Sequence, residues 1–246
     1  SSVGGARPKA TVRGAEGSLY IAKFSRPDDP YDVNAWEYVA LTLAKDVGLS
    51  VARNRLELVA KKQTLIVERF DRERGTRIPF VSAMTLVGGT DMGTHSYLEI
   101  NEALRRYGTK PKRDLQELWK RMAFNVAISN TDDHLRNHGF LWRGDGWELS
   151  PCYDVNPIPA AYGSGAHALL IDDATGVGDI ELVMSLRERF NVSRKQANDY
   201  RAELEKVINS WHRVAKRIGI AQRQISQFES AFELNRSSRG LARRPR

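Results

Sequence analysis

The chain has 246 residues, 41% hydrophobic and 28% charged, which is typical of a globular protein with a substantial buried core. No apolar run approaches the roughly 20 residues of a membrane helix, so no membrane partner is expected. A single cysteine, Cys152, excludes a disulfide scaffold and favours a cytoplasmic protein. The formal net charge is +8, but five arginines in residues 236–246 supply most of it. We expect that tail to be a flexible, solvated end.

The chain opens with a glycine pair that runs into a strand-like segment. Gly4 and Gly5 allow a backbone to approach a phosphate closely, and Arg7 and Lys9 add positive charge. Residues 10–12 then alternate as a strand does. A glycine pair is also a common ordinary turn, so this signal gains weight only from the segments after it.

A second strand is predicted at residues 18–24, and it carries Lys23. A glycine loop followed by a lysine on the next strand is how kinases cover and hold phosphates. Residues 32–47 are predicted to form a helix, with Glu37 one position from its apolar face. Glu37 could turn toward Lys23 or remain exposed, and spacing does not separate the two outcomes.

A hairpin is predicted from residues 55–59 and 64–68, after which the chain leaves the sheet through Glu68, Arg69 and Phe70. In a kinase, a strand leaving the small lobe forms the hinge that binds adenine through its backbone. The first lobe is therefore predicted to span residues 1–75.

Residues 77–93 have no periodic pattern and are expected to be irregular. A helix over 98–107 follows, with His95 as a structural contact near its start. The next predicted helix begins at Asp114, a good N-cap residue, and ends near Ser129. Its apolar stripe indicates a buried, rigid support for the segment after it.

That segment carries three polar side chains at informative spacing. Asp132 and Asn137 are five residues apart, and Asp154 follows seventeen residues later, after a predicted hairpin over 140–149. Phosphoryl transfer needs a carboxylate that orients the attacking hydroxyl, and an amide oxygen and a second carboxylate that hold Mg²⁺. The spacing matches a kinase catalytic loop, although Asp and Asn at such intervals also form ordinary caps and turns.

Three helices are predicted for the rest of the chain, over 180–190, 193–219 and 222–234. Trp211 and His212 are expected to be packing residues. The second lobe is therefore predicted to span residues 76–235, with the basic tail at 236–246.

Together, these motifs resemble the HipA family of bacterial serine/threonine kinases, the toxins of HipA/HipB toxin–antitoxin systems. The resemblance implies an α+β fold of two lobes, like a protein kinase: a small β-rich lobe with one helix, and a larger helical lobe. The matching segments are Ser2-Val3-Gly4-Gly5-Ala6-Arg7-Pro8-Lys9, Ala22-Lys23-Phe24, Glu37, Val67-Glu68-Arg69-Phe70-Asp71-Arg72, Thr131-Asp132-Asp133-His134-Leu135-Arg136-Asn137 and Pro151-Cys152-Tyr153-Asp154.

The resemblance implies roles for individual residues. Asp132 resembles the general base, Asn137 and Asp154 the Mg²⁺ ligands, and Lys23 the lysine that holds the phosphates of ATP. The loop that covers those phosphates would consist of Gly4, Gly5, Ala6, Arg7, Pro8 and Lys9.

It also implies that Glu68, Arg69 and Phe70 form the adenine hinge and that His134 contacts the nucleotide. Ser2 matches the loop serine that HipA kinases phosphorylate on themselves. A phosphate there would add about two negative charges beside the phosphates of ATP, so autophosphorylation would inhibit the enzyme.

The family's partners are a helix-turn-helix antitoxin, through which DNA is bound indirectly, and protein substrates that include translation proteins. Two differences from the family pattern limit how far the family's roles and partners can be expected of this chain. HipA proteins usually carry another subdomain before the glycine loop, so this chain is expected to be a fragment or a short member. Arg7-Pro8 also replaces the Gln-Glu of the best-known members.

Three alternatives remain open at this point. A small-molecule kinase would keep Asp132, Asn137 and Asp154 and differ in its acceptor site. A nucleotide-binding interaction module would lack turnover, which the presence of all three groups opposes. A metal phosphohydrolase would use Asp133 and His134 with Asp132, but adjacent loop residues seldom converge on one metal.

Overall fold

The computed structural model describes residues 7–73, 75–91, 93–163 and 165–233. Its N-terminal part is a four-stranded sheet in the order β1-β2-β4-β3, with every neighbouring pair antiparallel. The strands are β1 (Lys9–Arg13), β2 (Leu19–Lys23), β3 (Asn54–Val59) and β4 (Lys62–Glu68). β3 and β4 form a hairpin whose turn places Ala60 and Lys61 at positive φ.

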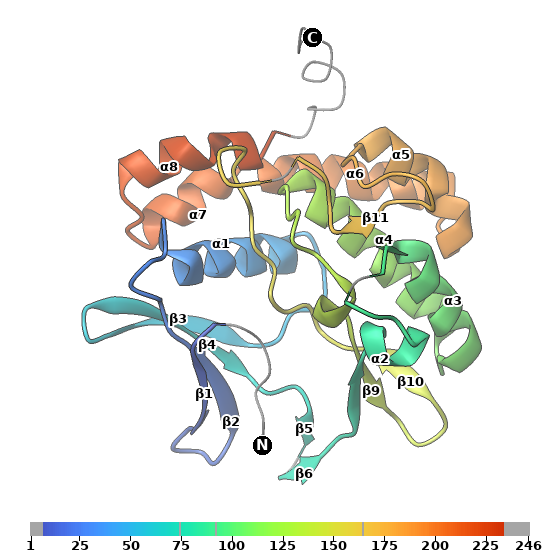
Figure 1. Ribbon diagram of the computed structural model, residues 1–246, viewed down its shortest axis with the longest axis horizontal. Helices are drawn as coiled ribbons and strands as arrows, with labels where there is room; N and C mark the ends of the chain where they lie inside the picture. The colour runs from blue at the N-terminus through green and yellow to red at the C-terminus, as the bar shows by residue number, and fades with distance from the viewer. Residues whose placement is uncertain (1–6, 74, 92, 164, 234–246) are drawn as a thin grey trace, which may run out of the picture.

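Helix α1 (Val33–Asp46) lies between this sheet and the helices of the C-terminal part (Figure 1). It begins where the Asp32 carboxylate accepts a hydrogen bond from the Ala35 N–H at 3.1 Å. Beyond its end, Gly48 adopts a φ of +82°, a conformation that glycine adopts without strain. Trp36 stacks on Phe228 with 3.6 Å between ring centroids, so α1 is buried on both sides.

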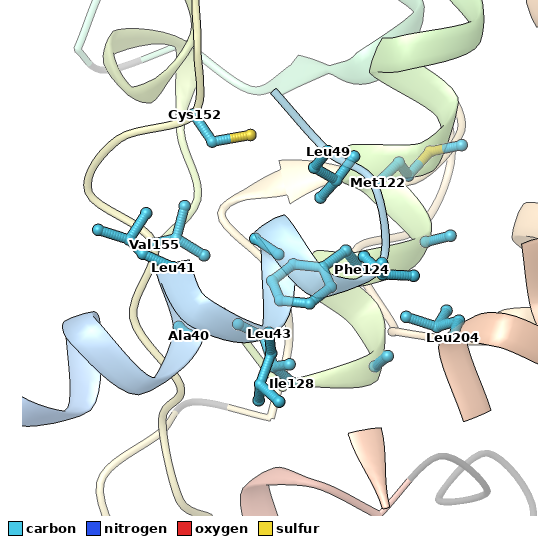
Figure 2. Close-up of a cluster of buried hydrophobic side chains, with 14 of the residues drawn as sticks. Ala40, Leu41, Leu43, Leu49, Met122, Phe124, Ile128, Cys152, Val155 and Leu204 are labelled. Atoms are coloured by element: carbon cyan, nitrogen blue, oxygen red, sulfur yellow. The ribbon is translucent and has the colours of Figure 1, made fainter. Parts of the chain in front are cut away.

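One hydrophobic core joins the two parts of the molecule. Figure 2 shows Leu41 and Leu43 of α1 in one buried cluster with Phe124 of α4 (Pro111–Ala127) and Leu204 of α6 (Arg194–Ile208). Leu65 of the sheet belongs to the same cluster and is 0% exposed. Burial of such side chains contributes about 1.5–3 kcal/mol each, so the sheet and the helices are held together firmly.

The C-terminal part is mainly helical. Its α-helices are α2 (Ala83–Val87), α3 (Tyr97–Tyr107), α4 (Pro111–Ala127), α5 (Ile180–Ser185), α6 (Arg194–Ile208), α7 (Trp211–Arg217) and α8 (Gln222–Phe228). Short 3-10 turns are η1 (Leu135–Asn137), η2 (Leu186–Phe190) and η3 (Glu229–Ala231). The remaining strands are β5 (Arg72–Glu73), β6 (Thr76–Arg77), β7 (Phe80–Ser82), β8 (His95–Ser96), β9 (Gly139–Trp142), β10 (Trp147–Leu149) and β11 (Leu169–Leu170).

Several sequence predictions are corrected here. Helix α4 begins at Pro111, because proline is well suited to the first helical position, and Asp114 lies inside the first turn rather than at the N-cap. The segment expected to be irregular contains β6, β7 and α2, and β7 pairs with β9. The helix predicted over 180–190 ends as the 3-10 turn η2, and the one over 193–219 divides into α6 and α7.

The α+β class, with an antiparallel N-terminal sheet, one helix on it and a helical C-terminal part, is confirmed. His95 is a structural contact as expected: its Nδ1 lies 2.7 Å from a Glu99 carboxylate oxygen one turn along α3. Trp211 is buried and stacks on His212. In the described ranges, every helix is too short or too polar to cross a membrane. The division at residue 75 stays a prediction.

Candidate active site

Lys23 and Glu37 form an ion pair at the interface of β2 and α1. The lysine Nζ lies 2.6 and 2.8 Å from the two carboxylate oxygens of Glu37. Lys23 also donates to the Asp154 carboxylate at 2.9 Å, across 131 residues of sequence. The side chains of Lys23 and Glu37 are only 12% and 3% exposed, whereas that of Asp154 is 39% exposed. The ion pair between Lys23 and Glu37, which the sequence alone could not establish, is therefore present. Its lysine also bonds to Asp154, in the segment after β10.

The charges of this cluster shift each other's pKa. Burial alone would lower the pKa of Lys23, but Glu37 and Asp154 outweigh burial and raise it, so the lysine is charged at neutral pH. Burial raises the pKa of Glu37, and Lys23 opposes that rise. Burial would also raise the pKa of Asp154, yet Lys23 outweighs it and holds that pKa below its ordinary value. Asp154 is therefore ionised and available to a cation.

The backbone at Asp154 is bent to present its side chain. Its φ is +58°, uncommon for a residue other than glycine, and its N–H donates to Glu37 at 3.2 Å. The Tyr153 hydroxyl donates to the Arg136 carbonyl at 2.6 Å, which ties this segment to the loop that carries Asn137. Cys152 N–H donates to the Ser50 carbonyl at 2.7 Å, so the segment is anchored on the sheet side as well.

The loop after α4 carries Asp132 and Asn137. α4 ends in a turn at Ser129, whose φ is +52°, and Asn130 N–H donates back to the Asn125 carbonyl at 2.9 Å. Asn137 is buried in η1, and its side-chain amide donates to the Asp132 carbonyl at 3.3 Å. A hydrogen bond within the loop thus joins Asp132 and Asn137, the two residues that the sequence spacing selected.

Asp132 is exposed on this loop, and among the described residues its carboxylate accepts no hydrogen bond. Partial burial nevertheless raises its pKa, an effect that His134 opposes and the negative charge of Asp154 increases. A carboxylate with a raised pKa and free acceptor positions can accept a proton from a hydroxyl brought to it.

Asn137 and Asp154 offer oxygen atoms suited to Mg²⁺. The Asn137 amide nitrogen is already used as a donor, which leaves its Oδ1 as the acceptor atom, and Lys23 occupies only one carboxylate oxygen of Asp154. Mg²⁺ commonly takes one or two protein oxygens and fills its shell with phosphates and water. Within the part of the chain that the structure describes, no three His, Cys, Asp or Glu side chains gather as a metal site. The donor set fits a Mg²⁺ ion that is shared with a nucleotide.

Asp133 differs from the exposed Asp132 in being buried, with only 2% of its surface exposed. Its Oδ2 accepts from Asn125 at 2.9 Å, from His138 Nε2 at 3.0 Å and from the Tyr97 hydroxyl. Burial would raise the pKa of Asp133, but His138 and the other donors lower it. These bonds hold Asp133 away from Asp132, which contradicts a metal site built from Asp132, Asp133 and His134.

The predicted hinge leaves one backbone donor open. The N–H groups of Glu68 and Arg69 donate to the carbonyls of Arg53 and Leu19, at 2.8 and 2.9 Å. The Phe70 N–H has no backbone acceptor among the described residues, so Phe70 remains the position suited to adenine. The Arg69 guanidinium instead binds Asp71, at 2.6 and 2.8 Å.

The predicted phosphate loop is only partly described. Arg7 binds the Asp29 carboxylate at 2.5 Å, a partner that no sequence signal indicated because it lies in an aperiodic segment. Burial lowers the pKa of Lys9, and the charges of Asp154 and Lys23 both act on it, which places Lys9 at the site. Pro8 is joined to Phe24 through its carbonyl, at 2.9 Å. Ser2, Gly4, Gly5 and Ala6 lie outside the described residues.

His134 lies on the same loop, and it acts to lower the pKa values of both Asp132 and Asp154, which places it near them. Its Nδ1 is buried and finds no hydrogen-bond partner among the residues that the structure describes. An unpartnered ring nitrogen beside the site is compatible with a contact to a ligand, and the nucleotide contact stays a prediction.

Comparison with known proteins decides the family. Residues 1–228 match the model of the HipA-like C-terminal domain. The chain belongs to this family of kinases. A relative by sequence is the serine/threonine-protein kinase toxin HipA of Shewanella oneidensis, 26% identical over 186 residues, which are 63% of this chain and 42% of the relative. The chain spans about a third to a half of the length of the curated relatives it matches, 31–49%.

Two solved structures share the fold. The HipA of Shewanella oneidensis, in complex with HipB and its operator DNA, has a TM-score of 0.73 at 18% identity; the match covers 92% of this chain and 61% of that one. The proinflammatory kinase CtkA of Helicobacter pylori has a TM-score of 0.68 at 16% identity, covering 91% and 88%. The HipA-like fold is thus present over nearly the whole chain.

Proposed function

We propose that this HipA-like chain is an ATP- and Mg²⁺-dependent serine/threonine protein kinase. The observation that carries the proposal is the buried Lys23–Glu37 pair, which reaches Asp154 across the two parts of the molecule. A lysine held in this way by a helix glutamate is the arrangement that positions ATP phosphates in protein kinases. The family, in which a relative is named a serine/threonine-protein kinase, supports the same activity.

The proposed reaction is transfer of the γ-phosphoryl group from ATP to a serine or threonine hydroxyl. The hydroxyl oxygen forms a bond to the γ-phosphorus, the bond between that phosphorus and the β–γ bridging oxygen breaks, and ADP leaves. The hydroxyl proton passes to Asp132, whose carboxylate has free acceptor positions and a raised pKa. Lys23 balances negative charge on the phosphates.

Asn137 and Asp154 would hold Mg²⁺, which, when bound, neutralises charge on the triphosphate. Phe70, with its open backbone N–H, and the neighbouring Glu68 and Arg69 would border the adenine. His134 and the segment from Gly4 to Lys9 would contact the rest of the nucleotide.

We further propose that the acceptor is a bacterial protein, with the translation machinery as the first class to test, and that Ser2 is an autophosphorylation site. A helix-turn-helix antitoxin is the proposed partner, with DNA bound only through it. The solved neighbour in complex with HipB and operator DNA supports this partner class. We also propose a toxin role, supported by the family and by the Shewanella relative, which is a kinase toxin.

The test is incubation with Mg²⁺ and labelled ATP, with wild type beside Asp132→Asn, followed by intact-mass measurement and site mapping. We expect a mass gain of one phosphate on wild type alone, mapped to Ser2, and labelling of an added protein substrate by wild type alone. Nucleotide binding without transfer to protein or water in the wild type would reject the kinase assignment for this chain.

A further inference from the structure

The carboxylate of Asp133 is the centre of a buried network directly behind the exposed Asp132. Three donors converge on its Oδ2: the Tyr97 hydroxyl, Asn125 Nδ2 at 2.9 Å and His138 Nε2 at 3.0 Å. The four side chains are 0–5% exposed. A buried carboxylate with three donors is fixed in position, because moving it would leave several polar groups without partners.

The donors come from three separate elements. Tyr97 is the first residue of α3, Asn125 lies in the last turn of α4, and His138 directly precedes β9. The ring of Tyr97 meets the ring of His138 edge-on at 5.6 Å between centroids, so the donors also pack on each other. Asp133 therefore joins the catalytic loop to three rigid elements through one oxygen atom.

A second set of bonds fastens the same loop from its other side. The Asp133 carbonyl accepts from Leu169 N–H at 3.0 Å, and the Thr131 carbonyl accepts from Ala168 N–H at 2.9 Å. Asn125 also accepts from the Asn130 side chain at 3.1 Å, so one α4 residue holds both sides of Asp132. Among the described residues, the Asp132 side chain makes none of these bonds, and the Asp132 carbonyl accepts from the Asn137 side chain at 3.3 Å.

We propose that Asp133 is a positioning residue, which sets the place of Asp132 and Asn137 for phosphoryl transfer without touching nucleotide or acceptor. The inference rests on the proposed kinase activity of the same loop. Asn137 is included because it bonds to the Asp132 carbonyl and because His138, a donor to Asp133, follows it directly. A displacement of about 1 Å at such groups can reduce turnover about 100-fold.

The test compares Asp133→Asn with Asp114→Asn. Asp114 is a matched control: it is equally buried at 2%, accepts from Leu149 N–H and Arg113, and lies on the same helix as Asn125. Eleven residues separate it from Asn125, about 16 Å along the helix axis. Both variants are purified as the full chain and compared for melting temperature, ATP dissociation constant, kcat for phosphate transfer, and amide hydrogen exchange.

For Asp133→Asn we expect kcat to fall about 10- to 100-fold. Its ATP affinity should stay within about threefold of wild type, because the Lys23–Glu37 pair is untouched. Amides of residues 131–137 and 168–169 should exchange faster. For Asp114→Asn we expect a lower melting temperature with unchanged kcat and unchanged exchange in those two segments.

Tyr97→Phe, which removes a single donor, carries the test if Asp133→Asn does not fold. It should lower kcat by a smaller factor, again at constant ATP affinity. The proposal would be overturned if wild type and Asp133→Asn (or Tyr97→Phe in its place) had equal kcat and equal amide exchange in residues 131–137 below their melting temperatures. If the wild type transfers no phosphate, the kinase function fails, and the exchange comparison still decides whether Asp133 fixes the loop.

Discussion

Two carboxylate clusters adjoin the loop of residues 131–137, and they differ in what holds them. In the front cluster, Lys23 bonds to Glu37 and Asp154, charge against charge, and the Asp154 side chain is 39% exposed. In the rear cluster, Asp133 bonds to three nearly fully buried side chains at one oxygen. Lys23 can therefore release Asp154 to solvent or a cation, whereas Asp133 has no exposed side toward which it could move. The ion pairs of the front cluster can thus exchange one partner for another, whereas the hydrogen bonds of the rear cluster stay in place.

The largest effect is expected from Lys23→Met, which removes the cation that bonds to both oxygens of the Glu37 carboxylate. Loss of a positive group beside the phosphates should reduce transfer about 100- to 1,000-fold. Glu37 is left buried without this cation, so the free energy of unfolding should fall by about 3–5 kcal/mol. Phosphate transfer and urea unfolding measure the two effects. Near-normal activity would show that the front cluster is structural only.

Glu37→Gln tests whether the front cluster needs charge or only hydrogen bonds. The glutamine can still accept from Lys23 and from Asp154 N–H, so the loss of unfolding free energy should be about 1–2 kcal/mol. Transfer should fall about 10-fold or more, because the lysine is less well positioned. The matched control is Glu148→Gln, another largely buried carboxylate that holds a lysine, Lys110, at 2.7 Å. That control should transfer phosphate normally; a similar loss there would point to general destabilisation.

In the front cluster, Lys23 and Asp154 could be singled out from the sequence, whereas the pairing of Glu37 with Lys23 was left open. The rear cluster was not predictable. Glycine loop, strand lysine and the Asp132, Asn137 and Asp154 spacing all follow the chain's local patterns, and the structure brings the described ones together. Two partners of Asp133, Tyr97 and Asn125, come from helices, and no periodic pattern distinguishes them from ordinary packing positions. The third, His138, directly precedes β9. Spacing therefore selected candidate site residues, whose chemical roles stay predictions, but not the residues that hold their loop in place.

The errors in the fold also arise from contacts between segments that are distant in the sequence. β7 has only three residues, too few for an alternating pattern, and it forms because β9 offers it a paired edge. Asp114 resembles an N-cap residue, but Pro111 starts the helix and the Asp114 carboxylate accepts from Leu149 instead. In both places tertiary contacts override the local preference.

Tyr153 connects the segment of Asp154 to the loop that carries Asn137, and its removal should have a moderate effect. Its hydroxyl donates to the Arg136 carbonyl, next to Asn137, while Asp154 follows it in sequence. Burial raises the pKa of Tyr153, so the hydroxyl stays protonated and remains a donor throughout the neutral range. Tyr153→Phe should cost about 1 kcal/mol of unfolding free energy and lower transfer a few-fold. In a Mg²⁺ titration of transfer activity, the variant should need a higher Mg²⁺ concentration than wild type. An unchanged titration would show that Tyr153 does not position Asp154.

The smallest effect on stability, with the clearest sign, is expected for Asp132→Asn. The pKa of Asp132 is raised in the folded protein above the ordinary 3.8, so ionisation of this carboxylate favours the unfolded state. The cost is present at neutral pH and disappears below 3.8, where both states are protonated. Because Asp132 is exposed, the variant should gain no more than about 0.5 kcal/mol at pH 7. Wild-type transfer should lose its base as pH falls through that raised pKa, so its acid limb should lie above 3.8. Thermal unfolding at two pH values measures the gain, and a large loss of stability would mean that Asp132, like Asp133, holds the loop.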